Sequence, residues 1–296
     1  LNSAYFNKFN LQGAVSEFNH SERTGSGNNH NINFFSDLYE IKTSLNHNSF
    51  IDSNSEGLIG FHFQNYDQGA LGDEESHLVH TRTSSFALFA LESFNFDLFD
   101  LDVGARVESV NLKNTSNEKG FFPGAFSSTI KREIFTNNTV FGGFDFTERA
   151  PNAVELFANG PHHALEQFEV GDSNMNVETS YNFSIGYSYN DGLDTLKIET
   201  YYNYIDDFIA ADRDGTTTNV EGEDMNDVIF SQYNALFTGL EVSGQYAFAK
   251  INDFDFISNL MFDFLKGYRT SNDKALSRIP QTKMNFGIKA TNEDWD

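Results

Sequence analysis

Apolar and polar residues alternate one by one over many short stretches of this chain. From Phe99 to Glu108, every odd position is apolar and every even position is charged or glycine. From Tyr181 to Asn190, aromatic and aliphatic residues alternate with asparagine, serine and glycine. A period of two residues places apolar side chains on one face of a β-strand and polar side chains on the other. The pattern therefore predicts strands with one apolar and one hydrated face, as in a wall between lipid and water.

The same period predicts about twelve strands, whose connections alternate between long and short. Strands are expected near residues 9–18, 34–46, 57–66, 84–93, 98–109, 121–131, 138–147, 180–190, 194–206, 233–248, 253–266 and 281–290. Long connections are expected near residues 19–33, 67–83, 110–120, 148–179, 207–232 and 267–280, and short ones near 47–56, 94–97, 132–137, 191–193 and 249–252. Alternate connections of an up-and-down barrel lie on the same rim. The sequence thus predicts an all-β fold, an antiparallel up-and-down transmembrane β-barrel with its long loops on one rim.

Composition fits this fold and excludes several classes of protein. Aromatic residues make up 15% of the chain, which suits strand ends at a membrane–water interface. No apolar run approaches the roughly 20 residues of a membrane-spanning helix, and no secretory leader pattern follows Leu1. A formal net charge of −24 opposes binding to nucleic acid and favours cations, although it also serves solubility. With no cysteine, the chain forms no disulfide and no cysteine-ligated metal site.

The sequence contains no signature of an enzyme. It has no Gly-x-Ser-x-Gly elbow, no phosphate-binding glycine loop and no His-Glu-x-x-His pair. Arg106 and Arg149 are expected to pair with carboxylates. His62 alternates with apolar residues and is predicted to face the barrel interior, whereas His47 falls in a short turn on the rim opposite the long loops. We therefore expect no enzymatic activity.

One long segment carries a more specific signal than the strand pattern. Residues 148–162 read ERAPNAVELFANGPH, with a short helical turn expected near 152–158, and residues 168–172 continue as FEVGD. This segment resembles the long extracellular loop of TonB-dependent outer-membrane receptors. Further similarity lies in residues 72–89, 178–187, 201–209, 237–241 and 277–280, so the resemblance covers roughly residues 60–290. It is closest to the branch of that family that takes up zinc or other metals and their chelates.

The resemblance implies a barrel of about 22 strands with an N-terminal plug domain and an energy-coupling box. Neither the plug nor the box is visible in this sequence, which ends at Asp296 without a terminal aromatic residue. Residues 1–296 are therefore expected to be a barrel fragment, about twelve strands of a larger barrel, in which the plug and the last strands are absent. The implied location is the bacterial outer membrane. The implied partners are its lipid and, through the plug, the TonB energy-coupling complex.

Histidines and carboxylates gather on the long connections of the predicted barrel. The histidines are His20, His30, His77, His80, His162 and His163. The carboxylates that accompany them are Glu17, Glu22, Asp73, Glu74, Glu75, Glu166 and Glu169. Imidazole and carboxylate form a good ligand set for divalent metals, although no spacing here is diagnostic and polar loops contain these residues in any case. Within the resemblance, His20 with Glu22 and His162 are the strongest candidates for a site at the mouth, with the remaining ligands expected from the plug.

The segment from Asp206 to Asp227 is strongly acidic. It contains eight carboxylates and one arginine. A solvated acidic loop is the simplest interpretation, and calcium binding or cation funnelling is the functional one. The stretch lacks the spacing of a helix–loop–helix calcium site.

Together these observations predict an outer-membrane receptor that actively takes up a metal ion or metal chelate with energy from the TonB system. Zinc is the favoured cargo and an iron–siderophore is the next, and no resident cofactor is required. A passive porin-like or structural barrel remains an alternative, which would lack the plug. A soluble secreted β-rich adhesin is the second alternative, and it would stay in the aqueous phase without detergent.

Overall fold

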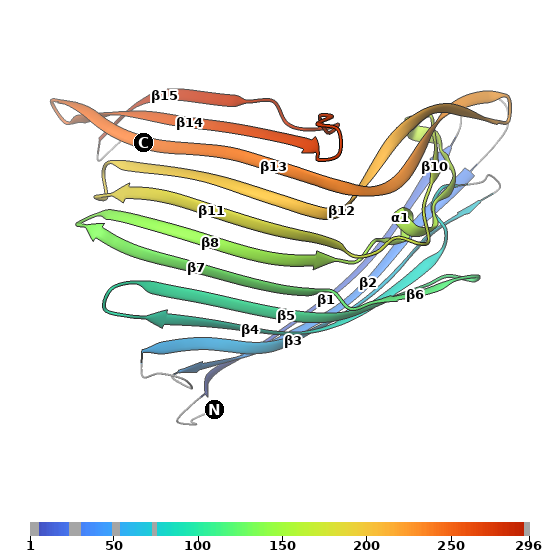
Figure 1. Cartoon of the computed structure of the whole chain (residues 1–296), viewed down its shortest axis with the longest axis horizontal. Coiled ribbons are helices and arrows are strands. Elements are labelled where there is room, and N and C mark those ends of the chain that lie inside the picture. The colour runs from blue at the N-terminus through green and yellow to red at the C-terminus, as the bar shows by residue number, and fades with distance from the viewer. Residues whose placement is uncertain (1–5, 24–30, 49–53, 73–75, 293–296) are drawn as a thin grey trace.

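The computed structural model describes residues 6–23, 31–48, 54–72 and 76–292. Its strands are β1 (Phe6–Arg23), β2 (Asn31–Asn48), β3 (Ser55–Gly72), β4 (Thr81–Asn95), β5 (Asp100–Lys113), β6 (Glu118–Phe121), β7 (Gly124–Phe135), β8 (Asn138–Arg149), β9 (Asn159–His162), β10 (Gln167–Val170), β11 (Glu178–Asn190), β12 (Thr195–Val220), β13 (Glu223–Ile251), β14 (Phe254–Arg269) and β15 (Lys283–Thr291). Helix α1 (Ala153–Phe157) and the 3-10 turn η1 (His163–Leu165) lie between β8 and β11. All fifteen strands join one sheet (Figure 1).

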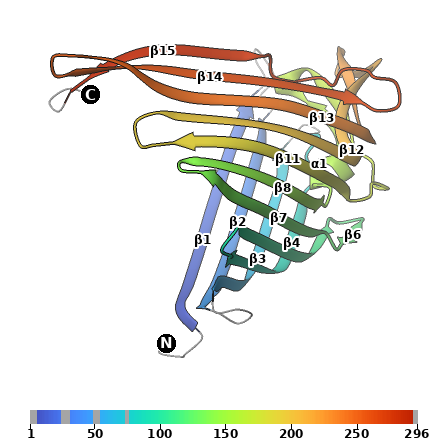
Figure 2. The ribbon, with the colours of Figure 1, turned by 60° about the vertical axis from the view of Figure 1, so that its left-hand side comes forward.

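The predicted up-and-down β fold is confirmed. Each of the twelve predicted strands corresponds to one long strand, and the other three strands, β6, β9 and β10, have four residues each. Consecutive long strands pair with one another in antiparallel fashion, and β10 alone among the described strands pairs in parallel, with β13. Figure 2 shows the sheet as a curved wall, in which β1 and β15 do not pair with each other. No helix in the described part of the chain has the length and apolar character needed to cross a membrane.

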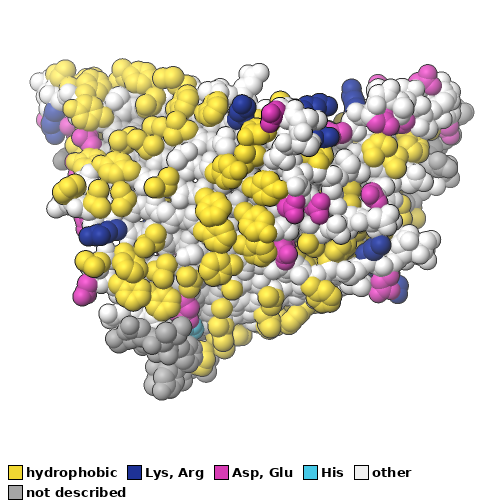
Figure 3. Space-filling view, viewed as in Figure 1, with side chains coloured by type: hydrophobic (Ala, Val, Ile, Leu, Met, Phe, Trp, Pro, Cys, Tyr) yellow, Lys and Arg dark blue, Asp and Glu magenta, His cyan; other side chains and the backbone are white. Residues whose placement is uncertain are grey.

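One face of the sheet, which we call the outer face, is apolar across its width. The register carries apolar positions from strand to strand, so that Phe61 lies opposite Leu88 and Leu88 opposite Val107. Large apolar side chains exposed on this face include Phe9, Leu11, Val15, Tyr39, Ile41, Ile59, Phe63, Phe86, Phe126, Ile130, Tyr181, Phe183, Ile185 and Tyr202. A groove of about 640 Å³ with apolar lining crosses β1 to β5. Figure 3 shows a broad hydrophobic area that thins toward the rim with α1 and β10, where acidic side chains gather.

The opposite, concave face carries polar and charged side chains. His62 lies on this face opposite Lys42, and its Nε2 is 2.8 Å from Oε1 of Glu40. Arg106, also on this face, pairs with Glu108 at 2.9 Å. The predictions that His62 faces the interior and that Arg106 pairs with a carboxylate are confirmed. A single sheet with one apolar and one polar face therefore replaces the buried core of an ordinary domain.

Several strands extend further than the alternation predicts. β1, β2 and β3 have 18 residues each, and their ladders continue beyond the last alternating position. The prediction that His47 lies in a short turn is therefore wrong. His47 belongs to the end of β2, is 1% exposed, and has its Nε2 3.0 Å from Glu92. Hydrogen bonding between neighbouring backbones fixes where a strand ends, and the side-chain pattern does not report it.

The described long connections, residues 114–123, 150–177 and 270–282, lie at one rim. The predicted long connections at 19–33 and 67–83 are about half strand, because β1 and β3 extend to Arg23 and Gly72 and β2 and β4 begin at Asn31 and Thr81. The predicted long connection at 207–232 is wrong, because β12 and β13 run through it and meet at the turn Glu221–Gly222. Both turn residues have positive φ, 51° and 94°, as a two-residue type I′ hairpin requires. Runs of β-branched residues, such as Thr216–Thr218, favour extended backbone even where neither face is apolar. The acidic stretch is thus a hairpin rather than a loop, and its described residues do not form a group of three converging metal donors.

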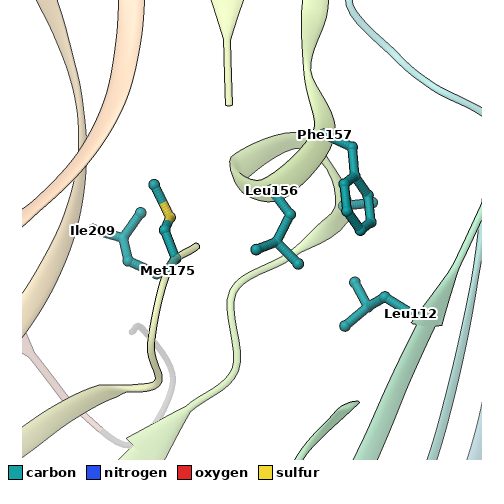
Figure 4. Close-up of a cluster of buried hydrophobic side chains, with 6 residues drawn as sticks. Leu112, Leu156, Phe157, Met175 and Ile209 are labelled. Carbon is teal, nitrogen blue, oxygen red and sulfur yellow. The ribbon is translucent and has the colours of Figure 1, made fainter. Parts of the chain in front are cut away.

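The segment between β8 and β11 folds onto the concave face. Leu156 and Phe157 of α1 pack with Leu112 of β5, Met175 and Ile209 in a small apolar core (Figure 4). Leu112 and Leu156 are 1% and 2% exposed, respectively. The long wall strands have little buried interior of their own. This small core therefore holds residues 150–177, which we call the mouth segment, in a fixed place relative to the wall.

Candidate metal site

Three segments from distant parts of the sequence meet at the rim with the long connections. β9 and β10 form a short antiparallel hairpin, whose register places His162 and Glu169 on the same face. The parallel pairing of β10 with β13 attaches this hairpin to the wall. The third segment, residues 76–80, joins it because the N–H of His77 donates to the carbonyl oxygen of Pro161 at 3.1 Å. Side chains from the hairpin and from residues 76–80 therefore converge, and β13 anchors the hairpin.

His77, His162 and Glu169 form the group. One donor atom from each lies within 4.8 Å of the other two. Nδ1 of His162 is 2.8 Å from Oε1 of Glu169, and the rings of His77 and His162 stack with centroids 4.2 Å apart and 12° between their planes. Glu169 is only 8% exposed, whereas both histidines are partly buried. This is the one group of three or more converging His, Asp or Glu donors in the described part of the chain.

His77 is held in a state suited to metal binding. Burial lowers the pKa of His77, while the nearby carboxylates of Glu169 and Glu22 oppose this effect. A lowered pKa keeps the ring neutral, which leaves a nitrogen lone pair available. Nδ1 of His77 lies 3.4 Å from the carbonyl oxygen of Pro161. A backbone carbonyl facing Nδ1 favours a proton there and directs Nε2 toward the ligand.

Gly160 permits the close approach of the His77 segment to β9. A Cβ atom at Gly160 would lie 2.6 Å from the carbonyl oxygen of Ser76 and 3.0 Å from the backbone nitrogen of His77. Both neighbouring atoms belong to the backbone, so neither can rotate away. Residue 160 must therefore lack a side chain if His77 is to stack on His162.

A partly buried ion-pair network fixes the start of the mouth segment. Arg149 contacts Glu155 at 2.9 Å and Glu178 at 3.2 Å, as the prediction of a carboxylate pair for Arg149 requires. Glu155 also completes a capping box with Asn152, because each side chain accepts a hydrogen bond from the other residue's backbone N–H. The helical turn predicted near 152–158 is confirmed as α1. A cavity of about 530 Å³ lies between this turn and the concave wall.

His20 and Glu22 lie beside the group, on the concave face of β1. Nε2 of His20 is 3.4 Å from Oε1 of Glu22. The ring of Phe34 lies between His20 and His77, with centroid distances of 6.3 Å to each. The pair singled out from the sequence therefore borders the group without belonging to it.

The other predicted candidates are placed elsewhere or lie outside the described residues. Asp73, Glu74, Glu75 and His30 are outside the described residues. His80 lies on the outer face, where its Nε2 contacts Asp67 at 2.7 Å and its ring meets Phe35. His163 begins the turn η1 and does not join the group. Glu169 accompanied the histidines in the sequence, but only the β9–β10 hairpin shows that it faces His162.

The geometry of the sheet defines a class of protein. A curved single-layer sheet with an apolar outer face, a polar concave face and long connections on one rim is the wall of an outer-membrane-type barrel. The family model described as TonB dependent receptor-like, beta-barrel, matches residues 1–296, and the chain belongs to this family.

Solved structures of receptors in this class share the fold. The copper transporter OprC superposes with a TM-score of 0.75 at 15% identity, covering 97% of this chain and 48% of OprC. The siderophore receptor PirA from Acinetobacter baumannii gives 0.66 at 14% identity, covering 95% of this chain and 45% of PirA. The hemophore receptor HasR from Serratia marcescens gives 0.64 at 12% identity, covering 97% and 56%. The chain thus spans about half the length of these structures, and at such identities the likeness is one of fold.

Proposed function

We propose that this chain forms wall and mouth of a TonB-dependent outer-membrane receptor that takes up a divalent transition-metal ion, with zinc as the favoured cargo. The observation that carries the proposal is the convergence of His77, His162 and Glu169 at the rim with the long connections. Two imidazoles and a carboxylate are a typical protein ligand set for Zn²⁺, with a further position left for water. The group contains no thiolate or thioether, the soft ligands that select Cu(I).

The arrangement favours a free ion over a metal already wrapped in a chelator. Tetrahedral Zn²⁺ with ligand bonds of 2.0–2.1 Å separates its donors by about 3.3 Å. Donor atoms that lie within 4.8 Å of one another reach this spacing through side-chain movements of about 1 Å. A siderophore that saturates its metal leaves no position for three protein ligands. An iron–siderophore is therefore the weaker candidate.

Glu169 contributes to metal binding either as a direct ligand or as the hydrogen-bond partner that orients His162. If His162 binds through Nδ1, the ion replaces the proton shared with Glu169, and both side chains become ligands. If His162 binds through Nε2, Glu169 keeps its 2.8 Å contact and orients the ring, as carboxylates behind metal-bound histidines commonly do. Both arrangements place His77 and His162 in direct contact with the ion, so both require the two imidazoles.

Transport by such a receptor depends on energy from the TonB complex and on lipid around the outer face. The apolar outer face supports insertion in the outer membrane, where no helix is needed. A passive channel is the competing function, and uptake separates the two. Zinc accumulation through the receptor is expected to stop when the inner-membrane proton gradient is collapsed, whereas leakage through a passive pore would continue.

The site is tested by zinc titration of the intact receptor in detergent. His77→Ala and His162→Ala are each expected to weaken zinc binding by more than the roughly 10–100-fold that loss of an outer-shell partner costs. His80→Ala is the matched control, because His80 lies near the same rim on the outer face. Zinc affinities of His77→Ala and His162→Ala equal to those of the unmodified receptor and of His80→Ala would remove the site.

A further inference from the structure

His20 and Glu22 have the geometry of a two-donor cation position. They are two residues apart on β1, so both side chains leave the strand on the concave face. Nε2 of His20 and Oε1 of Glu22 are 3.4 Å apart. This separation matches the about 3.3 Å between two ligands of a tetrahedral Zn²⁺ ion. One nitrogen and one oxygen can therefore bind the same ion without a change of backbone.

The pair is connected to the three-donor group by a continuous row of rings. Phe18, His20 and Phe34 follow one another with centroid distances of 6.3 Å, and Phe34 is 6.3 Å from His77. His77 in turn stacks on His162 at 4.2 Å. The row spans from β1 to β9 by way of Phe34 on β2 and His77.

Exposure rises from the three-donor group to the pair. The side chains of His20 and Glu22 are 50% and 32% exposed, whereas those of His162 and Glu169 are 28% and 10% exposed. An ion that reaches the rim from solvent meets the more exposed donors first. Two donors in water also hold an ion less tightly than three donors in a partly buried site, so the pair releases it more readily.

We propose that His20 and Glu22 form a second, outer cation position, from which a divalent metal ion passes to His77, His162 and Glu169. This inference rests on the proposed function of the three-donor group. Passage between sites requires that each position bind well enough to attract the ion and weakly enough to release it. The pair and the group meet this requirement through their difference in donor number and exposure. The competing interpretation is that His20 and Glu22 form a surface ion pair with no role in metal binding.

The rates of metal loading distinguish the two interpretations. The experiment uses the intact receptor in detergent, Zn²⁺ alone as the probe, and stopped-flow competition with a chromophoric chelator. The variant is His20→Gln/Glu22→Gln, which keeps polar side chains of similar size. His80→Ala is the control, since His80 is 51% exposed near the same rim but lies on the outer face.

An outer position on the path changes both directions of exchange. The double variant is expected to load and to release zinc about tenfold more slowly, within the range by which local charge alters association rates, so that the equilibrium affinity of the inner site changes far less than either rate. The single variants His20→Gln and Glu22→Gln should each show a smaller slowing in both directions. His80→Ala should load at the unmodified rate.

Two results would overturn the inference. Loading and release rates equal to those of His80→Ala would leave the pair as a surface ion pair. Slower loading with unchanged release, and hence weaker affinity, would make Glu22 a charge belonging to the inner site rather than a separate position. Failure of the proposed function looks different, because His162→Ala would then bind zinc as well as the unmodified receptor does.

Discussion

The wall of long strands and the mouth formed by residues 76–80 and 150–177 hold their side chains in place by different means. In the wall, a regular ladder decides which face each residue occupies, so neighbours such as Asn182 and Phe183 meet polar and apolar surroundings in turn. In the mouth, a few individual contacts fix the position of the chain. They are the capping box of α1, the pairing of Arg149 with two carboxylates, and the close approach of Gly160 to the backbone of Ser76 and His77. The wall should therefore respond to the chemical class of a substitution, and the mouth to the exact residue replaced.

The largest effect is expected for a charge placed on the outer face of the wall. Ile185 is 65% exposed on this face. Ile185→Lys should lower the free energy of unfolding by about 2–4 kcal/mol in a bilayer, because the ammonium group enters hydrocarbon. Asn182→Lys is the control on the concave face, where the new charge lies beside Asp145. Urea unfolding of the receptor in lipid vesicles measures the free energy of unfolding of both variants. An equal decrease for Ile185→Lys and Asn182→Lys would contradict the assignment of the two faces.

A smaller effect is expected where the mouth segment is anchored. Glu155→Ala removes the Glu155 half of the capping box and one carboxylate partner of Arg149, which should destabilise residues 150–177 by about 1–3 kcal/mol. The expected loss of stability is smaller than for a fully buried ion pair, because the Arg149 side chain is 42% exposed. Faster limited proteolysis within this segment, with an intact wall, is the expected readout. Glu118→Ala, which breaks an exposed pair with Lys113, should leave the cleavage rate unchanged.

The smallest effect concerns a residue with no side chain. Gly160→Ala should push the His77 segment away from β9 and weaken zinc binding about tenfold, comparable to losing an outer-shell partner. In a receptor that already carries His77→Ala, the same change should cost nothing further, because Gly160 acts through His77. Gly120→Ala, at a position with open space around it, is the control. Additive losses for Gly160→Ala and His77→Ala would show that Gly160 has a different role.

The wall could be predicted from the sequence because its information is local. Each strand carries its own two-residue alternation, so twelve strands could be read one at a time. The prediction failed at 207–232, where the hairpin of β12 and β13 lies beyond the alternating region and is held by backbone pairing. There the useful signal was the pair Glu221–Gly222, whose glycine suits a two-residue turn.

The mouth could be predicted only in part because its contacts join distant segments. The sequence marked His77, His162 and His80 as candidates on the same rim, but it could not show which of them meet. Extending the alternation of β4 back by one residue would have placed His80 on the outer face with Phe86 and Leu88. Nothing comparable marks Glu169, since its position depends on the short β9–β10 hairpin and on the approach allowed by Gly160.

The location of zinc in crystals of the intact receptor grown with Zn²⁺ tests the proposed metal site most directly. Anomalous scattering at the zinc edge should give its strongest peak at the rim with the long connections, about 2.0–2.2 Å from a ring nitrogen of His77 and one of His162. A peak at this place would establish that His77 and His162 bind zinc and that they do so at the rim with the long connections. A strongest peak elsewhere, for instance between His80 and Asp67 on the outer face, would contradict zinc binding by His77 and His162.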